Sequence, residues 1–369
     1  DNCYEYTCYV HELASGAACP LHRTGSALQV EWLDDQTLAL LKEEPGDGDP
    51  QVWLYEGLIG EGWLVTEHKT GVEWFKPFAG GLLYRASRPE REERKVRTDR
   101  YGRFTHWEQE ESASALYYVG LAELRRYGAA AKASTEDEAG KLPVPVIELS
   151  RLLPERLSIR DVVPSPMGDA LYLNCWQRDD RVHWRDTSAF RIGLDAGAAL
   201  AEHLRRERAS NAEQKETSAP AKKPSEDASY LGQIARLNLP RGAAVVAISP
   251  DGQTLLVAHR GRDERMFTRE DLWTLDLDTA LAAPDPAATL AAMHNLSAAL
   301  DQELYQVYWV SSGIYVSYPE STHMRVARLG EDSQAAPLDL GYIFPAWSYH
   351  ISNSGSLVLV GANAQAFQE

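Results

Sequence analysis

A strand–turn–strand pattern recurs six times along the chain: an apolar and aromatic stretch, a tight turn rich in Asp, Ser or Gly, and a second apolar stretch. The copies occupy residues 30–40, 72–84, 164–173, 248–257, 307–316 and 351–360. The clearest copy runs from Ile248 to Val257 through a Ser-Pro-Asp-Gly turn. Asp-Gly and its relatives supply the positive φ that a tight hairpin needs. The pattern therefore predicts a series of β-hairpins.

The spacing of the hairpins indicates how they are grouped. Anchor positions 32, 74, 165, 249, 309 and 352 are separated by 42, 91, 84, 60 and 43 residues. The short spacings match the roughly 40–50 residues of one propeller blade, and the longer ones fit a blade with an insertion. A third strand with half-buried alternation follows five of the hairpins, at 51–55, 115–119, 189–192, 271–277 and 325–329. We predict an all-β fold, a β-propeller with about seven four-stranded blades, incomplete at both ends.

The repeat also predicts how the chain is divided. We expect one β-propeller domain over 1–369, with a partial blade at 1–24, blades at about 25–70, 71–150, 151–238, 239–298 and 299–340, and a partial blade at 341–369. Two polar segments, 129–140 and 205–229, cannot bury a core and are predicted to be mobile surface insertions. Residues 196–208 are consistent with a short helix that leads into the second insertion.

The two ends of the chain fall in the middle of the repeat. Residues 6–16 have the pattern of a third strand with its turn, and no strand pair precedes them. Residues 351–360 end as a second strand, and 367–369 stand where a third would begin. Two arrangements are open at this point: the ends share one blade, or each belongs to a blade of its own.

The charge and the apolar runs narrow the class of protein. Lys and Arg number 37 and Asp and Glu 54, which gives a net charge of −17. Such a negative charge argues against nucleic acid or an anionic membrane as a partner. No apolar run reaches the length of a membrane-spanning helix, and the first residues have no signal-peptide pattern. We expect a soluble, cytoplasmic protein.

The cysteines do not indicate a disulfide framework or a metal site. Cys3, Cys8, Cys19 and Cys175 form no C-x-x-C pair, and no pair of histidines with ligand spacing lies near them. Three of the four are close to the N-terminus, unlike the distribution in a disulfide-rich secreted domain. We predict reduced, partly buried cysteines and no zinc.

The chain lacks the sequence motifs of several enzyme classes. It contains no G-x-S-x-G nucleophile elbow, no H-E-x-x-H, no P-loop and no G-x-G-x-x-G. Its ten histidines are scattered, without helical metal-ligand spacing. We therefore predict no catalytic residues, no metal and no cofactor in this chain.

One loop carries candidate substrate-binding residues. Residues 97–111, between a second and a third strand, mix aromatic side chains with both signs of charge. In the functional interpretation, this loop faces the substrate and its carboxylates hold a cationic peptide terminus. The candidate residues are Arg103, His106, Glu108, Glu110 and Glu111. In the alternative, which we favour, the loop is a solvated excursion with internal ion pairs.

Two other polar segments and the tryptophans have structural interpretations. Residues 43–50 carry oxygen ligands at alternate positions, which can hold Ca²⁺. They lack the terminal Glu of an EF-hand and two prolines, Pro45 and Pro50, flank the run, so a hairpin loop is predicted. Residues 260–265 and 269–271 could present Arg to a carboxylate ligand, but a solvated strand connection is favoured. Core packing at equivalent blade positions is predicted for Trp32, Trp74, Trp273 and Trp309.

The hairpins resemble those of a known family. Ile248–Ala258 followed by Asp271–Asp276 resembles a blade of the N-terminal β-propeller of prolyl oligopeptidase-family serine peptidases, most closely the acylaminoacyl-peptidase and dipeptidyl-peptidase branches. Residues 101–119 are similar to an insertion and strand in that branch, and residues 1–16 to the end of its first blade. The resemblance spans essentially the whole chain, through motifs of moderate specificity, since Ser-Pro-Asp-Gly hairpins also occur in unrelated propellers.

The resemblance implies a function for the chain. In the family, a seven-bladed propeller caps an α/β-hydrolase domain that carries Ser, Asp and His, and it restricts access to small peptides. The hydrolase half is missing from this sequence, so no catalytic residue of the family can be assigned to any position here. The implied function is a non-catalytic propeller that gates peptide access in a parent serine peptidase.

The implied partners are that α/β-hydrolase domain and short peptides, with no nucleic acid and no membrane, and a homo-oligomer is left open. The alternative function is a stand-alone propeller that scaffolds protein–protein interactions. The resemblance also implies that each end belongs to its own blade, which favours an open or partner-filled seam over a shared blade.

Overall fold

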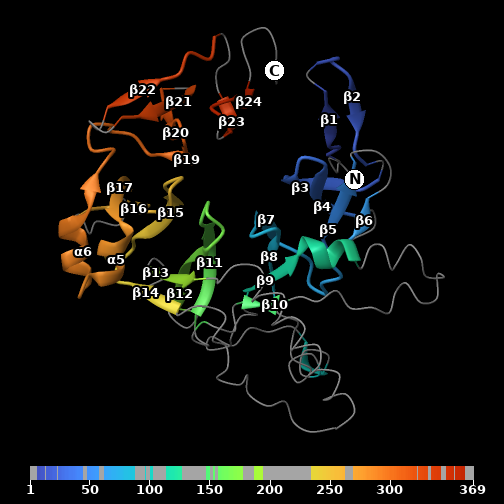
Figure 1. The fold of residues 1–369 in the computed structure, drawn as a ribbon, viewed down its shortest axis with the longest axis horizontal. Helices are drawn as coiled ribbons and strands as arrows, with labels where there is room; N and C mark the ends of the chain where they lie inside the picture. Colours follow the sequence, from blue (N-terminus) through green and yellow to red (C-terminus); the bar gives the residue numbers. More distant parts are fainter. Residues whose placement is uncertain are drawn as a thin grey trace. The chain divides into compact units, whose positions relative to one another are not determined.

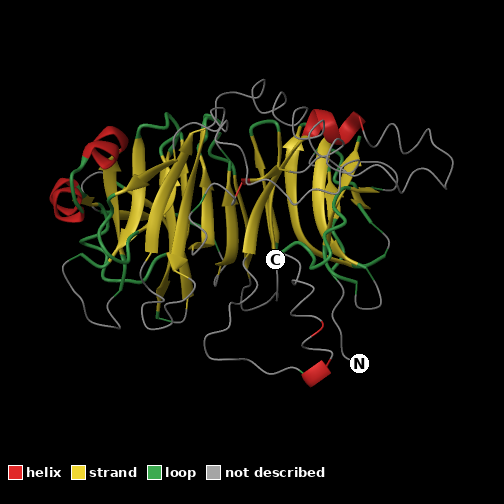
Figure 2. Cartoon of the chain, turned by 90° about the horizontal axis from the view of Figure 1, so that it is seen from below, coloured by secondary structure: helices red, strands yellow, loops and turns green. Residues whose placement is uncertain are grey.

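Strands make up most of the described chain (Figure 2). A computed structural model describes residues 6–12, 14–22, 24–44, 48–57, 62–87, 96, 100–102, 114–126, 147–149, 153, 157–177, 187–193, 234–261, 269–321, 323–330, 334–341, 346–352 and 354–361. The predicted insertions at 129–140 and 205–229, and the helix expected at 196–208, lie outside these residues. In the described part of the chain, no helix is both long enough and apolar enough to cross a membrane.

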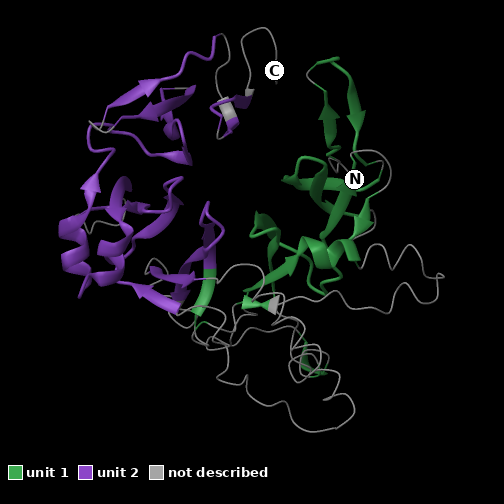
Figure 3. Cartoon of the chain, in the orientation of Figure 1, with its two compact units in different colours: residues 1–159, 195–231 green, residues 160–194, 232–369 purple. Residues whose placement is uncertain are grey.

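The chain divides into two compact units, 1–159 with 195–231 and 160–194 with 232–369 (Figure 3). The first unit holds a two-stranded sheet and two four-stranded sheets (Figure 1). Their strands are β1 (Tyr9–His11) and β2 (Ala18–Pro20); β3 (Ser26–Asp34), β4 (Thr37–Glu43), β5 (Gln51–Glu56) and β6 (Trp63–Leu64); and β7 (Trp74–Phe78), β8 (Gly81–Ser87), β9 (Ser114–Gly120) and β10 (Ile147–Glu148).

The second unit continues the same architecture through three four-stranded sheets and ends in a two-stranded one. Its first four-stranded sheet contains β11 (Leu157–Pro164), which begins at the boundary between the units, β12 (Ala170–Gln177), β13 (Thr187–Gly193) and β14 (Ile234–Leu237). The others are β15 (Ala244–Ile248), β16 (Thr254–His259), β17 (Asp271–Asp276) and β18 (His294–Asn295); β19 (Tyr305–Val310), β20 (Gly313–Glu320), β21 (His323–Leu329) and β22 (Ala335–Pro337); and β23 (Ala346–Ile351) with β24 (Leu357–Gly361). Helices α5 (Leu277–Ala282) and α6 (Pro286–Ala292) lie between β17 and β18.

The predicted all-β propeller architecture is confirmed, but the predicted number of blades is wrong. The described residues form five four-stranded blades instead of about seven. The difference arises at the ends, where β1–β2 and β23–β24 are sheets of two strands each. Within each blade, the strands pair with their neighbours in sequence order, as in a series of meanders.

The first strand of a blade has a distinct geometry. In four sheets, the register between the first and the second strand shifts, and the extra residues at each shift lie in the first strand. These first strands are β3, β15, β19 and β23. Such β-bulges raise the local twist of a strand. First strands of successive sheets also lie side by side, namely β3 with β7, β15 with β19, and β19 with β23. This neighbour relation is expected where blades stack face to face around their inner strands.

The hairpin turns account for much of the repeat seen in the sequence. In the turns that begin at Ser165, Ser249 and Ser352, the Gly N–H three residues later donates to the serine carbonyl at 2.8–2.9 Å. Those glycines, at 168, 252 and 355, have φ between 69° and 85°. This left-handed region is costly for residues with a Cβ, which explains why Gly recurs there.

The apolar core lies between neighbouring sheets. One cluster joins β4 and β5 to β7, β8 and β9 in the first unit, and includes Leu41, Leu54, Phe75 and Leu82. In the second unit, one cluster joins the β11–β14 and β15–β18 blades, the next joins β15–β18 to β19–β22, and a third joins β19–β22 to β23–β24. Each blade therefore contacts its neighbours mainly through the apolar side chains on the faces of its sheet.

The prediction that four tryptophans occupy equivalent core positions is wrong. Trp32, Trp74 and Trp309 lie on the first strands β3, β7 and β19, whereas Trp273 lies on the third strand β17. Trp273 and Trp309 pack against core clusters, but Trp32 is 51% exposed. A first strand has only one neighbouring strand in its sheet, so its side chains are covered less completely.

Candidate functional site

A pocket with a volume of about 420 Å³ lies in the first unit, between the β3–β6 and β7–β10 blades. It is lined by Asp34, Asp35, Gln36, Thr37, Glu56, Gly57 and Arg125. The first four residues form the β3–β4 turn, and Glu56 ends β5. Arg125 comes from a helical turn, 121–126, that directly follows β9 of the neighbouring blade.

The sequence of the helical turn explains why Arg125 reaches the pocket. Leu121 and Leu124 are buried in the core cluster shared by the two blades. The Leu121 N–H also donates to the Gly80 carbonyl at 3.0 Å. Residues three apart lie on one face of a helix, so these leucines fix that face inward. Arg125 and Arg126 are then exposed on the other side.

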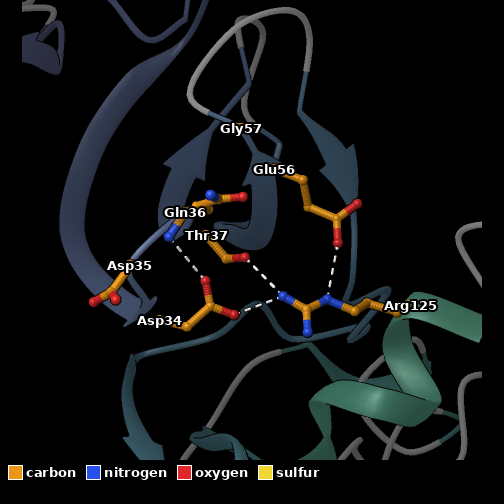
Figure 4. Close-up of a pocket in the computed structure, with 7 residues that line it drawn as sticks. All are labelled: Asp34, Asp35, Gln36, Thr37, Glu56, Gly57 and Arg125. Carbon is orange, nitrogen blue, oxygen red and sulfur yellow. Dashed lines mark hydrogen bonds and ion pairs between the residues drawn. The ribbon is translucent and has the colours of Figure 1, made fainter.

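Arg125 is the central cation of the pocket (Figure 4). Its Nη2 donates to Asp34 Oδ2 at 2.6 Å and to Thr37 Oγ1 at 2.9 Å. Its Nε donates to Glu56 Oε1 at 3.1 Å. One side chain thereby joins the β3–β4 turn to the end of β5, and it does so from the adjacent blade.

The same contacts set the electrostatics of the pocket. The pKa of Asp34 is lowered, chiefly by the hydrogen bond from the Gln36 N–H, then by that with Thr37, and further by Arg125. The pKa of Arg125 is raised, first by its hydrogen bond to Asp34. Asp35 points away from Arg125 (Figure 4). Three carboxylates and one guanidinium give the lining residues a net charge of −2.

This chemistry fits binding of a cationic group better than it fits catalysis. The pocket lining contains no Ser, Cys, His or Lys that could act as a nucleophile or as a base near neutral pH. Asp34 is held ionised by its partners, so it is poorly suited to donate or accept a proton at neutral pH. The contacts themselves join residues of two neighbouring blades.

A second polar cluster joins two strands of the β7–β10 blade. Glu73, directly before β7, pairs with Arg85 of β8 at 2.8 Å between Oε2 and Nε. The hydroxyls of Ser87 and Ser114 each donate to Glu73 Oε1 at 3.1 Å. Ser87 ends β8 and Ser114 begins β9, so the cluster holds the two ends of the connection in which the candidate residues lie.

The five residues predicted to bind substrate are not among those the structure describes. Arg103, His106, Glu108, Glu110 and Glu111 lie outside the described residues, and their role stays a prediction. Arg125 and Glu73 were missed by the sequence analysis, because their partners come from distant parts of the chain. The sequence offers one signal for Arg125, namely its position as a charged residue in the short amphipathic run 121–126.

The two weaker candidate segments show ion pairs in their described parts. Glu44 lies 2.7 Å from the Lys42 ammonium, which also lies 4.0 Å from the centre of the Trp53 ring. Arg260 pairs with Glu270 at 3.3 Å, and Arg269 with Asp271 at 3.0 Å. These pairs agree with the structural interpretation of both segments. Among the described residues, no three His, Cys, Asp or Glu side chains are grouped to hold a metal.

The described cysteines are free thiols in three different environments. Cys19 is exposed, Cys8 is half-buried and Cys175 is buried. Burial raises the pKa of Cys175 to about 12 and also raises that of Cys8. Cys3 lies outside the described residues.

Comparison with solved structures shows what the fold resembles. The acylaminoacyl peptidase of Pyrococcus horikoshii aligns with a TM-score of 0.58 and 11% identity, over 98% of this chain and 46% of that one. The fold is that of the propeller domains of this peptidase family. The β-propeller domain of the Trilobed protease from Pyrococcus furiosus aligns equally well, at 0.58 and 10% identity, over 98% of this chain and 82% of that domain.

Two solved structures of the peptidase family thus share the propeller fold, and the family resemblance seen in the sequence is confirmed in the fold. A structure from a study of two prolyl endopeptidases aligns at 0.50 and 12% identity, over 95% of this chain and 45% of that one. This chain spans about half the length of these full peptidases. No protein-family model matches the chain, and no curated protein matches its sequence.

Proposed function

We propose that this chain is the substrate-gating propeller of a serine peptidase, in which it shapes the access of peptides to an α/β-hydrolase domain. The observation that carries the proposal is the alignment of 98% of this chain with the acylaminoacyl peptidase of P. horikoshii. That alignment accounts for 46% of the peptidase, which leaves room for a domain that performs the chemistry.

Two properties of the described residues support a gating role. The pocket lining contains no Ser, Cys or His that could form a nucleophile–base pair, which fits hydrolysis by another domain. The Arg125 contacts tie neighbouring blades, as a ring that excludes folded proteins by its width would require. The assignment of 1–369 to one propeller domain and the cytoplasmic location stay predictions.

We also propose that the carboxylates of the 97–111 loop bind the cationic terminus of a peptide. The Glu73 cluster supports this idea, because it holds Ser87 and Ser114 at the two ends of the connection from β8 to β9. Arg103 and His106 would then orient the peptide beside Glu108, Glu110 and Glu111. Both charge signs in one loop suit a ligand that carries both signs itself.

The experiment begins by sequencing the gene on both sides of this segment. A reading frame with a G-x-S-x-G motif would be expressed in full. The complete protein is expected to hydrolyse a short peptide nitroanilide and to leave the same sequence intact within a folded domain. Unfolding that substrate domain should restore cleavage. Equal cleavage of the folded and unfolded forms would contradict gating, and a frame without a hydrolase would favour the scaffold function.

The loop proposal has its own variant. In the complete protein, E108Q, E110Q and E111Q together are expected to raise the KM for peptides with a free amino terminus by about tenfold, the loss of roughly one charge-assisted contact. Peptides with an acylated terminus should be unaffected. The matched control is E320Q, an exposed glutamate in β20. Equal effects on both peptide types would contradict the assignment.

A further inference from the structure

A buried histidine ends the second strand of the β15–β18 blade, in the second unit. His259 is the last residue of β16 and is 5% exposed. Its Nδ1 accepts a hydrogen bond from the Gly261 N–H at 3.1 Å. Since this ring nitrogen acts as the acceptor, it carries no proton, and the ring is neutral with its proton on Nε2. A backbone donor two residues later thus fixes both the charge and the tautomer of His259.

Two other elements hold the same residue. The indole N–H of Trp273, on β17, donates to the His259 carbonyl at 3.0 Å, and the two rings lie 6.4 Å apart, edge to face. The His259 ring also forms a hydrogen bond with the backbone of Arg241, which lies in the turn between β14 and β15. His259 therefore joins the β16–β17 connection to the turn that leads from the preceding blade into this one.

The glycine that donates to the ring is closely packed. Gly261 has a φ of 68°, in the left-handed region, and a Cβ there would lie 3.3 Å from Trp273 Cζ2. The turn at Gly261 therefore rests against the same tryptophan that holds the His259 carbonyl. A shift of the Gly261 N–H away from Nδ1 would disturb this packing as well as the hydrogen bond.

Burial and the neighbouring groups determine which form of the ring the fold stabilises. Burial has the largest effect and lowers the pKa of His259, and the charge of the adjoining Arg260 lowers it further. The carboxylate of Glu270, directly before β17, and the hydrogen bond with the Arg241 backbone act in the opposite direction. The net shift is downward, so the neutral ring is the stabilised form.

The carboxylate opposite the ring is already engaged by other donors. Asp271 pairs with His259 across β16 and β17. Its Oδ1 accepts from Arg269 at 3.0 Å and its Oδ2 from Asn295 at 2.8 Å. A protonated ring would have to compete with these donors for Asp271. Protonation of Nδ1 would also place an N–H opposite the Gly261 N–H, and a buried donor without an acceptor is costly.

We propose that His259 is an acid-sensitive switch: the neutral ring holds Gly261 and the Arg241 turn together, and protonation releases Gly261 and opens this corner of the blade. In the open form, the ring has an ordinary pKa of about 6.5. The closed form is therefore fully favoured above that pH and is destabilised as the pH falls below it. At pH 5.5, protonated open rings outnumber neutral ones about ten to one, so the open population should rise about tenfold from pH 7.5 to 5.5.

Hydrogen exchange of the Gly261 amide tests the switch in the wild-type chain. The exchange rate is measured by NMR between pH 5.5 and 7.5 and divided by the rate of an unfolded chain at each pH, so that it reports the open population. Protection of Gly261 is expected to fall about tenfold toward pH 5.5, while the amides of 255–257, in the middle of β16, stay protected. Constant protection of Gly261 would overturn the proposal, and so would an equal loss throughout β16.

Two variants assign the effect to one ring. H259N places an amide oxygen near the position of Nδ1, so it keeps an acceptor for Gly261 but does not titrate, and its Gly261 protection should be independent of pH. H294Q, which removes an exposed histidine of β18, is the matched control and should behave as wild type. A pH-dependent loss that persists in H259N or disappears in H294Q would overturn the proposal. The wild-type comparison of Gly261 with β16 stands even if H259N fails to fold. Neither result depends on peptidase activity, so the proposed function is tested separately.

Discussion

Arg125 Nη2 and Asp34 Oδ2 lie 2.6 Å apart although the two residues are separated by 91 positions in the sequence. Asp34 ends the first strand of one blade, and Arg125 follows the third strand of the next. Their contact forms only when the two blades pack as they do in the first unit. The pair therefore reports on the junction between the blades.

Removing the guanidinium should loosen that junction modestly. R125M keeps much of the apolar stem and loses the contacts with Asp34, Thr37 and Glu56. Since Arg125 is 46% exposed, we expect a loss of about 0.5–1 kcal/mol in the free energy of unfolding, as for exposed ion pairs. Urea unfolding measures it. R126M is the control, because Arg126 is 69% exposed and pairs with Glu123 at 3.2 Å within its own helical turn. A smaller loss for R125M than for R126M would contradict the prediction.

The contribution of Asp34 should depend on pH with a definite sign. Its pKa in the folded protein is below the ordinary value, chiefly through the Gln36 N–H. The ionised carboxylate therefore stabilises the fold above the unfolded pKa of about 3.9, and this stabilisation is lost as the pH falls through the folded pKa. The stability gap between wild type and D34N should be constant from pH 6 to 8 and should shrink below about pH 4. If the stability gap between wild type and D34N widened on acidification, the predicted direction of the pH dependence would be wrong.

The Ser-Pro-Asp-Gly turn should not tolerate a side chain at its glycine. Gly252 has a φ of 75°, and a Cβ there would lie 3.4 Å from Met167 Cγ. The left-handed backbone alone predicts that G252A destabilises the protein by about 1–2 kcal/mol. G120A serves as the control, because Gly120 has ordinary φ and a new Cβ would meet only Glu123 Cγ at 4.0 Å. Thermal unfolding of both variants would show whether the backbone is responsible.

The thiols should react in order of their exposure. Cys19 is exposed and should be alkylated within minutes at pH 8, whereas Cys175 is fully buried and its pKa is raised to about 12. The thiolate is the reactive species, so Cys175 should react only after urea unfolds the protein. Mass spectrometry after iodoacetamide treatment identifies the labelled residues, with C175S as the control. Rapid labelling of Cys175 in the folded protein would refute its buried position.

This chain alone should not hydrolyse peptides. The sequence lacks a nucleophile elbow, and the lining of the described pocket contains no Ser, Cys or His. Incubation with aminoacyl- and acylaminoacyl-nitroanilides should give no turnover above the buffer rate. Turnover that survives repurification and disappears with a serine-directed phosphonate would show a catalytic site within the chain.

The repeating hairpins could be predicted from the sequence because their turns are chemically constrained. The strands predicted on either side of the Ser249–Gly252 turn are present as β15 and β16, and the five predicted third strands are present as β5, β9, β13, β17 and β21. Positive φ at the turn glycines and alternation in the strands both act locally. Each of these signals can be seen within about ten residues of sequence.

The features that the sequence did not predict are short or depend on distant residues. The fourth strands have only two to four residues, too few to show a period. Helices α5 and α6 begin at the N-caps Asp276 and Asp285. Asp276 lies inside the strand predicted at 271–277, and the sequence analysis predicts no helix around Asp285. Arg125 was missed because its partners are supplied by another blade.

The placement of the apolar core between sheets has a consequence for unfolding. In the second unit, the clusters form a series in which the β15–β18 and β19–β22 blades each share both faces with neighbours. Such a series has no core common to all its blades. The unfolding of one blade is therefore coupled directly only to the blades that contact it, as in repeat proteins. Amide hydrogens should then exchange earliest in the hairpin β23–β24, whose core contacts lie on one face, and latest in β16, where Leu255, Leu256 and Val257 are 0% exposed. Loss of the terminal hairpin would leave the β19–β22 blade as the next sheet to exchange.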